Sequence, residues 1–149
     1  MKKTSLILLL TILLYSCSDN FSNNNPYIPN YTFSTTINLN LAQFSDLKFV
    51  SNAVYIGQPG VGVKGIYVFN TGSGYNAFDA TCPNQTLSDC STVAFKKLDS
   101  SDPLKVDKTT VVCPCDKEEY SLFTGQGKLQ YPLKQYRVEV NGNLLRVYN

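Results

Sequence analysis

The chain has 149 residues, of which 13 are basic and 11 acidic, and it contains no histidine. This length suits one domain with a hydrophobic core and is too short for two domains of ordinary size. No basic patch is visible, which argues against nucleic acid as a partner. Without histidine, the commonest general base and the usual partner of a nucleophilic Ser or Cys are missing, so we expect no enzyme activity.

Residues 1–16 have the three zones of a secretory signal. Lys2 and Lys3 supply the charged start, Leu6–Leu14 is an almost unbroken apolar run, and the small residue Ser16 follows. The run is shorter than the roughly 20 apolar residues that a membrane-spanning helix needs, so we interpret it as a signal and not an anchor. Because two lysines lie in this segment, the rest of the chain is formally neutral.

The stretch Leu14–Cys17 resembles the lipobox of bacterial lipoproteins, in which the cysteine is diacylated and the signal is then removed. The resemblance implies that Cys17 is the lipid-bearing first residue of the mature protein, held in a membrane by its acyl chains. Ser18–Asn20 also resembles the tags that send some lipoproteins to the cell surface. The expected location is therefore the bacterial cell envelope, at the outer membrane or cell surface. A soluble secreted protein cleaved nearby is the alternative.

Residues 17–30 are expected to form the lipidated cysteine and a flexible tether. Residues 18–30 are polar, rich in asparagine and punctuated by proline, a composition typical of a linker and not of a core. The folded domain is therefore expected to comprise residues 31–149.

Alternating apolar positions in this domain predict strands. In 31–41 the odd-numbered residues are apolar or β-branched, which is the period of an extended segment with one buried face. Val50–Ile56 and Ile66–Phe69 are two further expected strands. No stretch has a sustained helical period. We therefore expect an all-β fold, a small antiparallel β-sandwich or barrel.

The C-terminal segment predicts a hairpin. Tyr136, Val138 and Val140 alternate with polar residues, and Leu144–Tyr148 forms a second apolar run. Between them lies Asn141-Gly142, a pair that favours a two-residue turn because both residues tolerate positive φ.

Four cysteines remain in the expected domain: Cys82, Cys90, Cys113 and Cys115. An even number in an exported domain indicates two disulfide bonds, although four cysteines allow three pairings. A zinc site built from all four is an alternative. Its Cys-x-Cys spacing is shorter than the usual gap between zinc ligands, and an oxidising envelope favours disulfides.

The segments around the cysteines form an ordered series of motifs. The series is Tyr75–Asn84, Val111–Asp116, Tyr120–Gly127, Tyr131–Leu133 and the C-terminal hairpin. This order resembles the Rieske iron–sulfur domain, in which a Cys-x-His loop and a Cys-x-x-His loop cap a small antiparallel β domain. The resemblance covers roughly residues 50–149 and implies a Rieske-like fold.

The ligand positions depart from the Rieske pattern. Carried over by position, Cys82 and Cys113 fall on the two cysteine ligands, whereas Asn84 and Asp116 fall where the two histidines belong. A Rieske centre depends on two imidazoles on one iron, and an asparagine amide is a poor iron ligand. We therefore expect that the cluster has been lost and that no cofactor is bound. The segment between Asn84 and Cys113 is also longer than in most members of the Rieske family, with a polar insertion near residues 99–108.

The same resemblance implies how the cysteines pair. In Rieske domains the two ligand cysteines hold one iron, so Cys82 and Cys113 are implied to lie close enough to join. Cys115 matches a cysteine that forms a disulfide with the first loop in respiratory members of the family, and Cys90 is the candidate partner here. The implied bonds are Cys82–Cys113 and Cys90–Cys115.

The leading hypothesis is an envelope lipoprotein whose Rieske-like domain acts as a structural or binding module towards an unidentified protein partner. One rival is an electron-transfer protein that keeps a 2Fe–2S cluster through Cys82, Cys113, Asp116 and a further cysteine. The other rival is the zinc site with four cysteine ligands.

Overall fold

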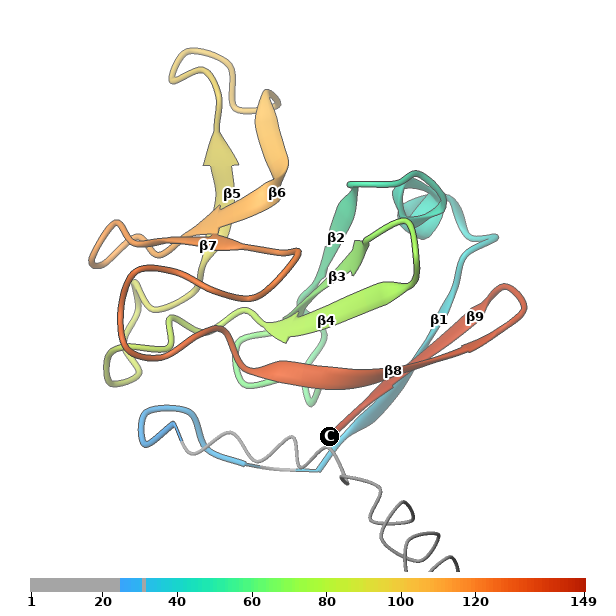
Figure 1. Cartoon of the computed structure of the whole chain (residues 1–149), viewed down its shortest axis with the longest axis horizontal. Helices are drawn as coiled ribbons and strands as arrows, with labels where there is room; N and C mark the ends of the chain where they lie inside the picture. Colours follow the sequence, from blue (N-terminus) through green and yellow to red (C-terminus); the bar gives the residue numbers. More distant parts are fainter. Residues whose placement is uncertain (1–24, 31) are drawn as a thin grey trace, which may run out of the picture.

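The computed structural model describes residues 25–30 and 32–149. The signal segment and Cys17 lie outside this part of the chain, so their assignments stay predictions. Figure 1 shows the order of the elements, whose bounds are β1 Ser34–Asn38, η1 Ala42–Lys48, β2 Ala53–Ile56, β3 Ile66–Asn70, β4 Tyr75–Asp79, β5 Ala94–Lys97, β6 Val106–Val112, β7 Glu119–Ser121, β8 Gln135–Asn141 and β9 Leu144–Tyr148. No helix within residues 25–30 and 32–149 is long and apolar enough to span a membrane.

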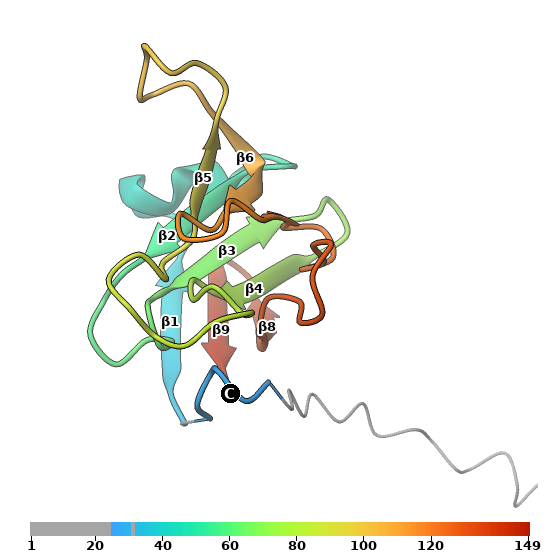
Figure 2. The same ribbon diagram turned by 90° about the vertical axis from the view of Figure 1, so that its left-hand side faces the viewer.

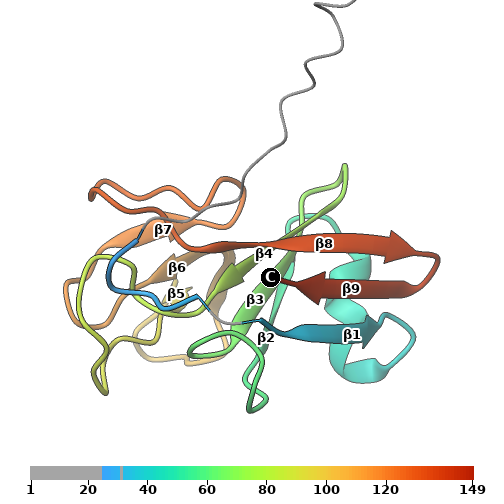
Figure 3. The same ribbon diagram turned by 90° about the horizontal axis from the view of Figure 1, so that it is seen from below.

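The larger of two sheets has the strand order β1-β9-β8-β4-β3-β2, and all its pairings are antiparallel. β8 connects its two halves, because its first residues pair with β4 and the rest pairs with β9. Figures 1 and 3 show that the sheet is curved and that η1 lies near β2. The all-β class and the antiparallel pairing expected from the sequence are confirmed.

β3 contributes to both hydrophobic cores of the domain. The first core includes Ile37, Leu47 and Leu145, and the second includes Phe78, Val111, Tyr120 and Leu122. Ile66 and Val68 face the first core, inside the curved sheet, whereas Tyr67 and Phe69 face the second core. All four side chains are buried, which explains why this segment is an unbroken apolar run and not an alternating one.

The smaller sheet has the order β5-β6-β7 and covers the second core. The β5–β6 hairpin extends away from the rest of the domain (Figures 1 and 2). The polar insertion noted near residues 99–108 lies at the tip of this hairpin and its return strand. The insertion therefore lengthens a hairpin and leaves the second core intact.

Two local expectations need correction. The C-terminal hairpin is present, but Asn141 pairs with Leu144, so the central turn residues are Gly142 and Asn143. Gly142 has φ 59°, as the first central residue of a type II′ turn requires. The helix η1 was not expected, because its short length cannot establish a helical period. It buries Phe44 and Leu47 three residues apart, as one turn of a 3₁₀ helix places them.

The last residues of the expected tether pack on the domain. Ile28 is 3% exposed and Asn25 is 6% exposed. Lys134, itself buried, donates hydrogen bonds to the carbonyl oxygen of Pro29 and to Oδ1 of Asn30. Residues 25–30 therefore make specific contacts with the domain, although their composition is typical of a linker. The ordered domain extends at least to Asn25.

Candidate functional site

The first cysteine loop follows β4 and is closed at its base. The amide of Cys82 donates to the Ser91 carbonyl at 2.8 Å, and the amide of Val93 donates to the Ala80 carbonyl at 2.7 Å. Within the loop, Oγ of Ser91 accepts from the Ser88 amide and donates to the Ser88 carbonyl. These bonds bring Cys90 back towards Cys82 at the end of the loop.

A buried carboxylate orients the start of this loop. Asp79, at the end of β4, accepts hydrogen bonds from the amides of Val63 and Thr81 and from the hydroxyl of Tyr136. The sequence did not single out Asp79, because two of its three partners, Val63 and Tyr136, lie 16 and 57 residues away in the chain. A carboxylate with three donors is well satisfied despite its burial.

The second cysteine loop is the tight connection between β6 and β7. Cys113 donates from its amide to the Glu118 carbonyl, and its own carbonyl accepts from the Lys117 amide, both at 2.9 Å. Oδ1 of Asp116 accepts from the Glu118 amide at 2.9 Å. Asp116 therefore has a local reason to stand in this turn, since aspartate side chains commonly bond the backbone two residues on.

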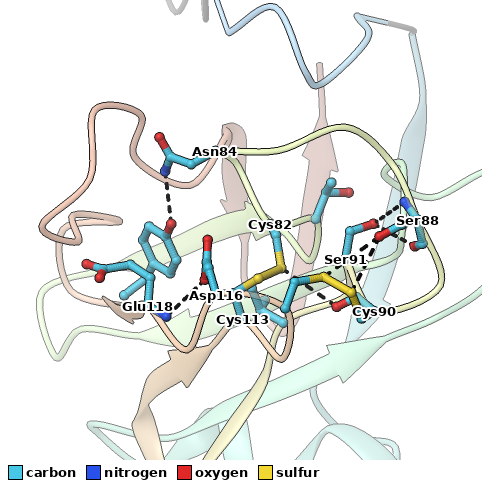
Figure 4. Close-up of a disulfide and its surroundings, with 12 residues drawn as sticks. Cys82, Asn84, Ser88, Cys90, Ser91, Cys113, Asp116 and Glu118 are labelled. Carbon is cyan, nitrogen blue, oxygen red and sulfur yellow. Dashed lines mark hydrogen bonds between the residues drawn. A yellow bond between two sulfur atoms is a disulfide. The ribbon is translucent and has the colours of Figure 1, made fainter.

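Two disulfides connect the loops, Cys82–Cys113 and Cys90–Cys115, with Cα–Cα distances of 5.6 and 5.4 Å. This is the pairing that the Rieske resemblance implied. Figure 4 shows the two bonds side by side. Cys82 and Cys113 are both 0% exposed, whereas Cys90 is exposed and Cys115 is half-buried. The sulfurs of Cys82, Cys113 and Cys115 all lie within 4.8 Å of one another.

Asn84 holds the first loop against the segment before β8. Its Nδ2 donates to the Tyr120 hydroxyl at 2.9 Å and to the Tyr131 carbonyl at 2.8 Å, and its Oδ1 accepts from the Tyr131 amide at 2.9 Å. Figure 4 shows Asn84 and a dashed line for the first of these hydrogen bonds. We call these three residues the Asn84 clamp. Both ends of the amide are engaged in protein hydrogen bonds.

Tyr120 is the fully buried member of the clamp and lies in the second core, together with the buried disulfide. Burial raises the pKa of its hydroxyl to about 12, against the opposing effect of the hydrogen bond from Asn84. Asp116 and Glu118 add a further raising effect through their charges. The hydroxyl therefore stays neutral at physiological pH, as a hydrogen-bond partner and not as a base.

The N-terminal segment reaches the same loops. Nδ2 of Asn25 donates to the carbonyl oxygen of Pro83 at 2.7 Å, and the ring of Tyr27 packs edge-on against Tyr131. Residues 25–30 thus connect the start of the described chain to the first cysteine loop and to the Asn84 clamp.

The residues present do not fit a 2Fe–2S cluster. Cys82 and Cys113 are bonded to each other, and the amide of Asn84 is fully engaged. Asp116 is exposed and bonds the Glu118 amide. Thiolates, not disulfide sulfurs, are the ligands of iron–sulfur clusters and zinc sites. Of the four positions that the resemblance matches to Rieske ligands, two form a disulfide, one belongs to the Asn84 clamp and one lies in a turn.

Comparison with known proteins gives similarity of fold at low identity. No family model and no curated protein matches the chain. Similar solved structures include Rieske-type ferredoxins and small subunits of nitrite reductases. The oxygenase–ferredoxin complex of carbazole 1,9a-dioxygenase matches at 18% identity over 75% of this chain and 91% of that one, with TM-score 0.45.

Two further ferredoxins are similar to a comparable degree. The carbazole 1,9a-dioxygenase ferredoxin of Nocardioides aromaticivorans is 16% identical over 76% of this chain and 96% of its own, with TM-score 0.44. The ferredoxin of Sphingomonas yanoikuyae B1 is 18% identical over 70% and 93%, with TM-score 0.41. At these values the likeness decides nothing about a cofactor, an activity or a partner of this chain.

Proposed function

We propose that this chain is an envelope lipoprotein whose Rieske-like domain has two disulfides in place of an iron–sulfur cluster and serves as a structural or binding module. The observation that carries the proposal is the buried Cys82–Cys113 bond. Cluster and disulfide exclude one another, because each sulfur can be a thiolate ligand or a disulfide partner but not both.

The structural side of the proposal rests on what the two bonds do for the loops. Each connects segments far apart in the chain, with separations of 31 and 25 residues. Closing a loop of this length is worth about 3.5 kcal/mol on the chain-entropy model. This is a substantial part of the roughly 5–15 kcal/mol that stabilises a typical domain. The cysteines therefore have a sufficient role without metal.

The two metal-binding alternatives, the 2Fe–2S cluster and the zinc site, both require free thiolates at Cys82 and Cys113. The test is iron and acid-labile sulfide analysis of full-length protein isolated without oxygen, followed by an attempt at cluster reconstitution. We expect no iron, no sulfide and no visible absorption. Two irons per chain in the isolated protein would overturn the proposal in favour of electron transfer, and one zinc per chain would favour the four-cysteine zinc site.

The anchoring side of the proposal rests on Leu14–Cys17, outside the described residues. In cells supplied with a labelled fatty acid, Cys17→Ala should abolish acyl labelling and release the protein from membranes. Cys90→Ala is the matched control and should keep the label, because the lipobox is untouched. Labelling of the Cys17→Ala variant would contradict the lipoprotein assignment.

A further inference from the structure

The two disulfides differ in access to solvent. Cys90 is exposed and Cys115 is half-buried, whereas Cys82 and Cys113 are fully buried in the second core. Thiol–disulfide exchange requires a thiolate to reach a disulfide sulfur. A thiol in solution can therefore attack the Cys90–Cys115 bond, and it cannot reach the Cys82–Cys113 bond while the domain stays folded.

One sulfur of the accessible bond lies beside the inaccessible one. Sγ of Cys115 is within 4.8 Å of the Sγ atoms of both Cys82 and Cys113. Cys115 lies two residues after Cys113 in the tight β6–β7 connection. Hydrogen bonds between Cys113 and residues 117 and 118 close this connection, so it keeps Cys115 near the buried bond. Figure 4 shows that the two disulfide bonds lie close together. Cys90 is on the other side of the accessible bond and is not part of this group of three sulfurs.

A hydroxyl is placed to assist the first step. Oγ of Ser88 lies 3.5 Å from Sγ of Cys90 and 3.7 Å from Sγ of Cys115. A serine hydroxyl can donate a hydrogen bond to a thiolate. When Cys90 is attacked and Cys115 leaves, Ser88 can stabilise the charge that develops on the Cys115 sulfur.

We propose that the four cysteines form a disulfide relay that accepts two electrons from a dithiol at Cys90 and passes them inward through Cys115. The inference goes beyond the proposed function and shares with it only the two disulfides. The substrate class is a dithiol, and Cys115 is the sulfur that transfers the reducing equivalents to the buried bond.

The relay consists of successive thiol–disulfide exchanges. One thiolate of the dithiol attacks Sγ of Cys90, a mixed disulfide forms, and Cys115 leaves as a thiolate. Cys115 then attacks the Cys82–Cys113 bond, forms a new disulfide with one of these sulfurs and releases the other as a thiolate. The second thiolate of the dithiol then attacks the dithiol's own sulfur in the mixed disulfide. The dithiol leaves as a cyclic disulfide, and Cys90 is released as a thiolate. One dithiol loses two electrons, and the protein gains two thiols while it keeps one disulfide.

A matched pair of variants in the full chain tests the relay. Cys90→Ser leaves Cys115 free beside the buried bond, whereas Cys115→Ser leaves Cys90 free, outside the group of three sulfurs. After incubation at mildly alkaline pH, free thiols are alkylated and the disulfides mapped by mass spectrometry. In Cys90→Ser we expect Cys115 to be found bonded to Cys82 or Cys113, with the alkyl group on the displaced cysteine. In Cys115→Ser we expect the alkyl group on Cys90 and an intact Cys82–Cys113 bond.

The rate at which the buried bond is reduced gives a second readout. With dithiothreitol as the dithiol, a free thiol at Cys82 or Cys113 should appear at least about tenfold faster in wild type than in Cys115→Ser, because the wild type alone has the internal thiolate. Equal rates in the two proteins, or a Cys90→Ser variant whose alkyl group stays entirely on Cys115, would overturn the relay. Either result leaves the disulfides and the absence of iron unaffected, so it is distinguishable from failure of the proposed function.

Discussion

The six-stranded sheet and the paired cysteine loops are stabilised in different ways. The first core, inside the curved sheet, is made of aliphatic and aromatic side chains from strands that mostly pair with their sequence neighbours. The loop region joins the second core through two covalent bonds and the Asn84 clamp. Its contacts connect segments 25 to 47 residues apart.

This difference predicts which part of the protein should respond when the disulfides are reduced. Apolar burial in the sheet is independent of the redox conditions, whereas the loops owe much of their order to bonds that a reductant removes. Reduction should therefore loosen β6, β7 and the loops first, and the sheet should persist. The variants described below test whether the sheet and the loops are stabilised separately.

The largest effect is expected where β3 supports the second core. Phe69 is fully buried and its ring packs edge-on against Phe123. Phe69→Ala should lower the free energy of unfolding by about 3–5 kcal/mol, because burial is lost and a cavity remains. Urea unfolding would measure it. Phe49→Ala is the control, since Phe49 is 65% exposed, and it should change stability by less than about 0.5 kcal/mol.

Removing each disulfide separately compares the buried bond with the exposed one. The Cys82→Ala/Cys113→Ala protein should lose about 4 kcal/mol of unfolding free energy, most of it the loop-closure contribution. The Cys90→Ala/Cys115→Ala protein should lose less, roughly 3.5 kcal/mol, because its loop is shorter and its sulfurs contribute little to the core.

Hydrogen exchange would locate these losses. In both double variants the amides of β6 and β7 should exchange faster, while those of β3 keep the protection they have in wild type. Equal acceleration in β3 would show that loops and sheet unfold as one unit and would contradict the contrast between them.

A smaller effect is expected from opening the Asn84 clamp. Asn84→Ala leaves the amide and carbonyl of Tyr131 and the hydroxyl of Tyr120 without this partner, which should cost about 1–3 kcal/mol. Thermal unfolding would measure it. Asn76→Ala serves as a comparison, because Asn76 Nδ2 donates only to two backbone carbonyls and its loss leaves no amide donor unpaired. An Asn84→Ala protein as stable as wild type would remove the structural reason for asparagine at this position.

The weakest effect is a dependence on alkaline pH. Burial raises the pKa of Tyr120 to about 12 and that of Tyr67 still further. Both groups are neutral in the folded and unfolded states below about pH 10. Above it the unfolded tyrosines ionise first, so stability should fall as the pH rises from about 10 towards 12. Tyr120→Phe should show a shallower fall, measured by urea unfolding across this range. A slope identical to that of wild type would count against the buried, protonated Tyr120.

Parts of the fold were predictable wherever one face of a strand is buried. The alternation before Leu41 and in the C-terminal hairpin gave β1, β8 and β9, although the turn lies one residue further along than expected. β6 was not predicted, since its sequence Val106–Val112 mixes lysine and threonine with valine and has only one buried residue. Its place in the sheet depends on pairing with β5 and β7, which no local pattern records.

The site was predictable only in part, for a related reason. The pairing of the cysteines was implied by the order of motifs and could not have come from spacing alone. The roles of Asn84 and Asp79 depend on partners up to 57 residues away, so the sequence offered no signal for them. The contacts of Asn25 and Ile28 were hidden by a polar, proline-rich composition that normally indicates a linker.

The most direct test of the central claim is the disulfide map of the native protein. Cells would be lysed in the presence of an alkylating agent, and the unreduced protein digested and mapped by mass spectrometry. We expect one peptide pair joined through Cys82 and Cys113 and another joined through Cys90 and Cys115, with no alkylated cysteine in the folded domain. Alkylated Cys82 and Cys113 would show that these sulfurs are thiols in the cell, and would contradict the account in which a covalent bond has replaced the cluster.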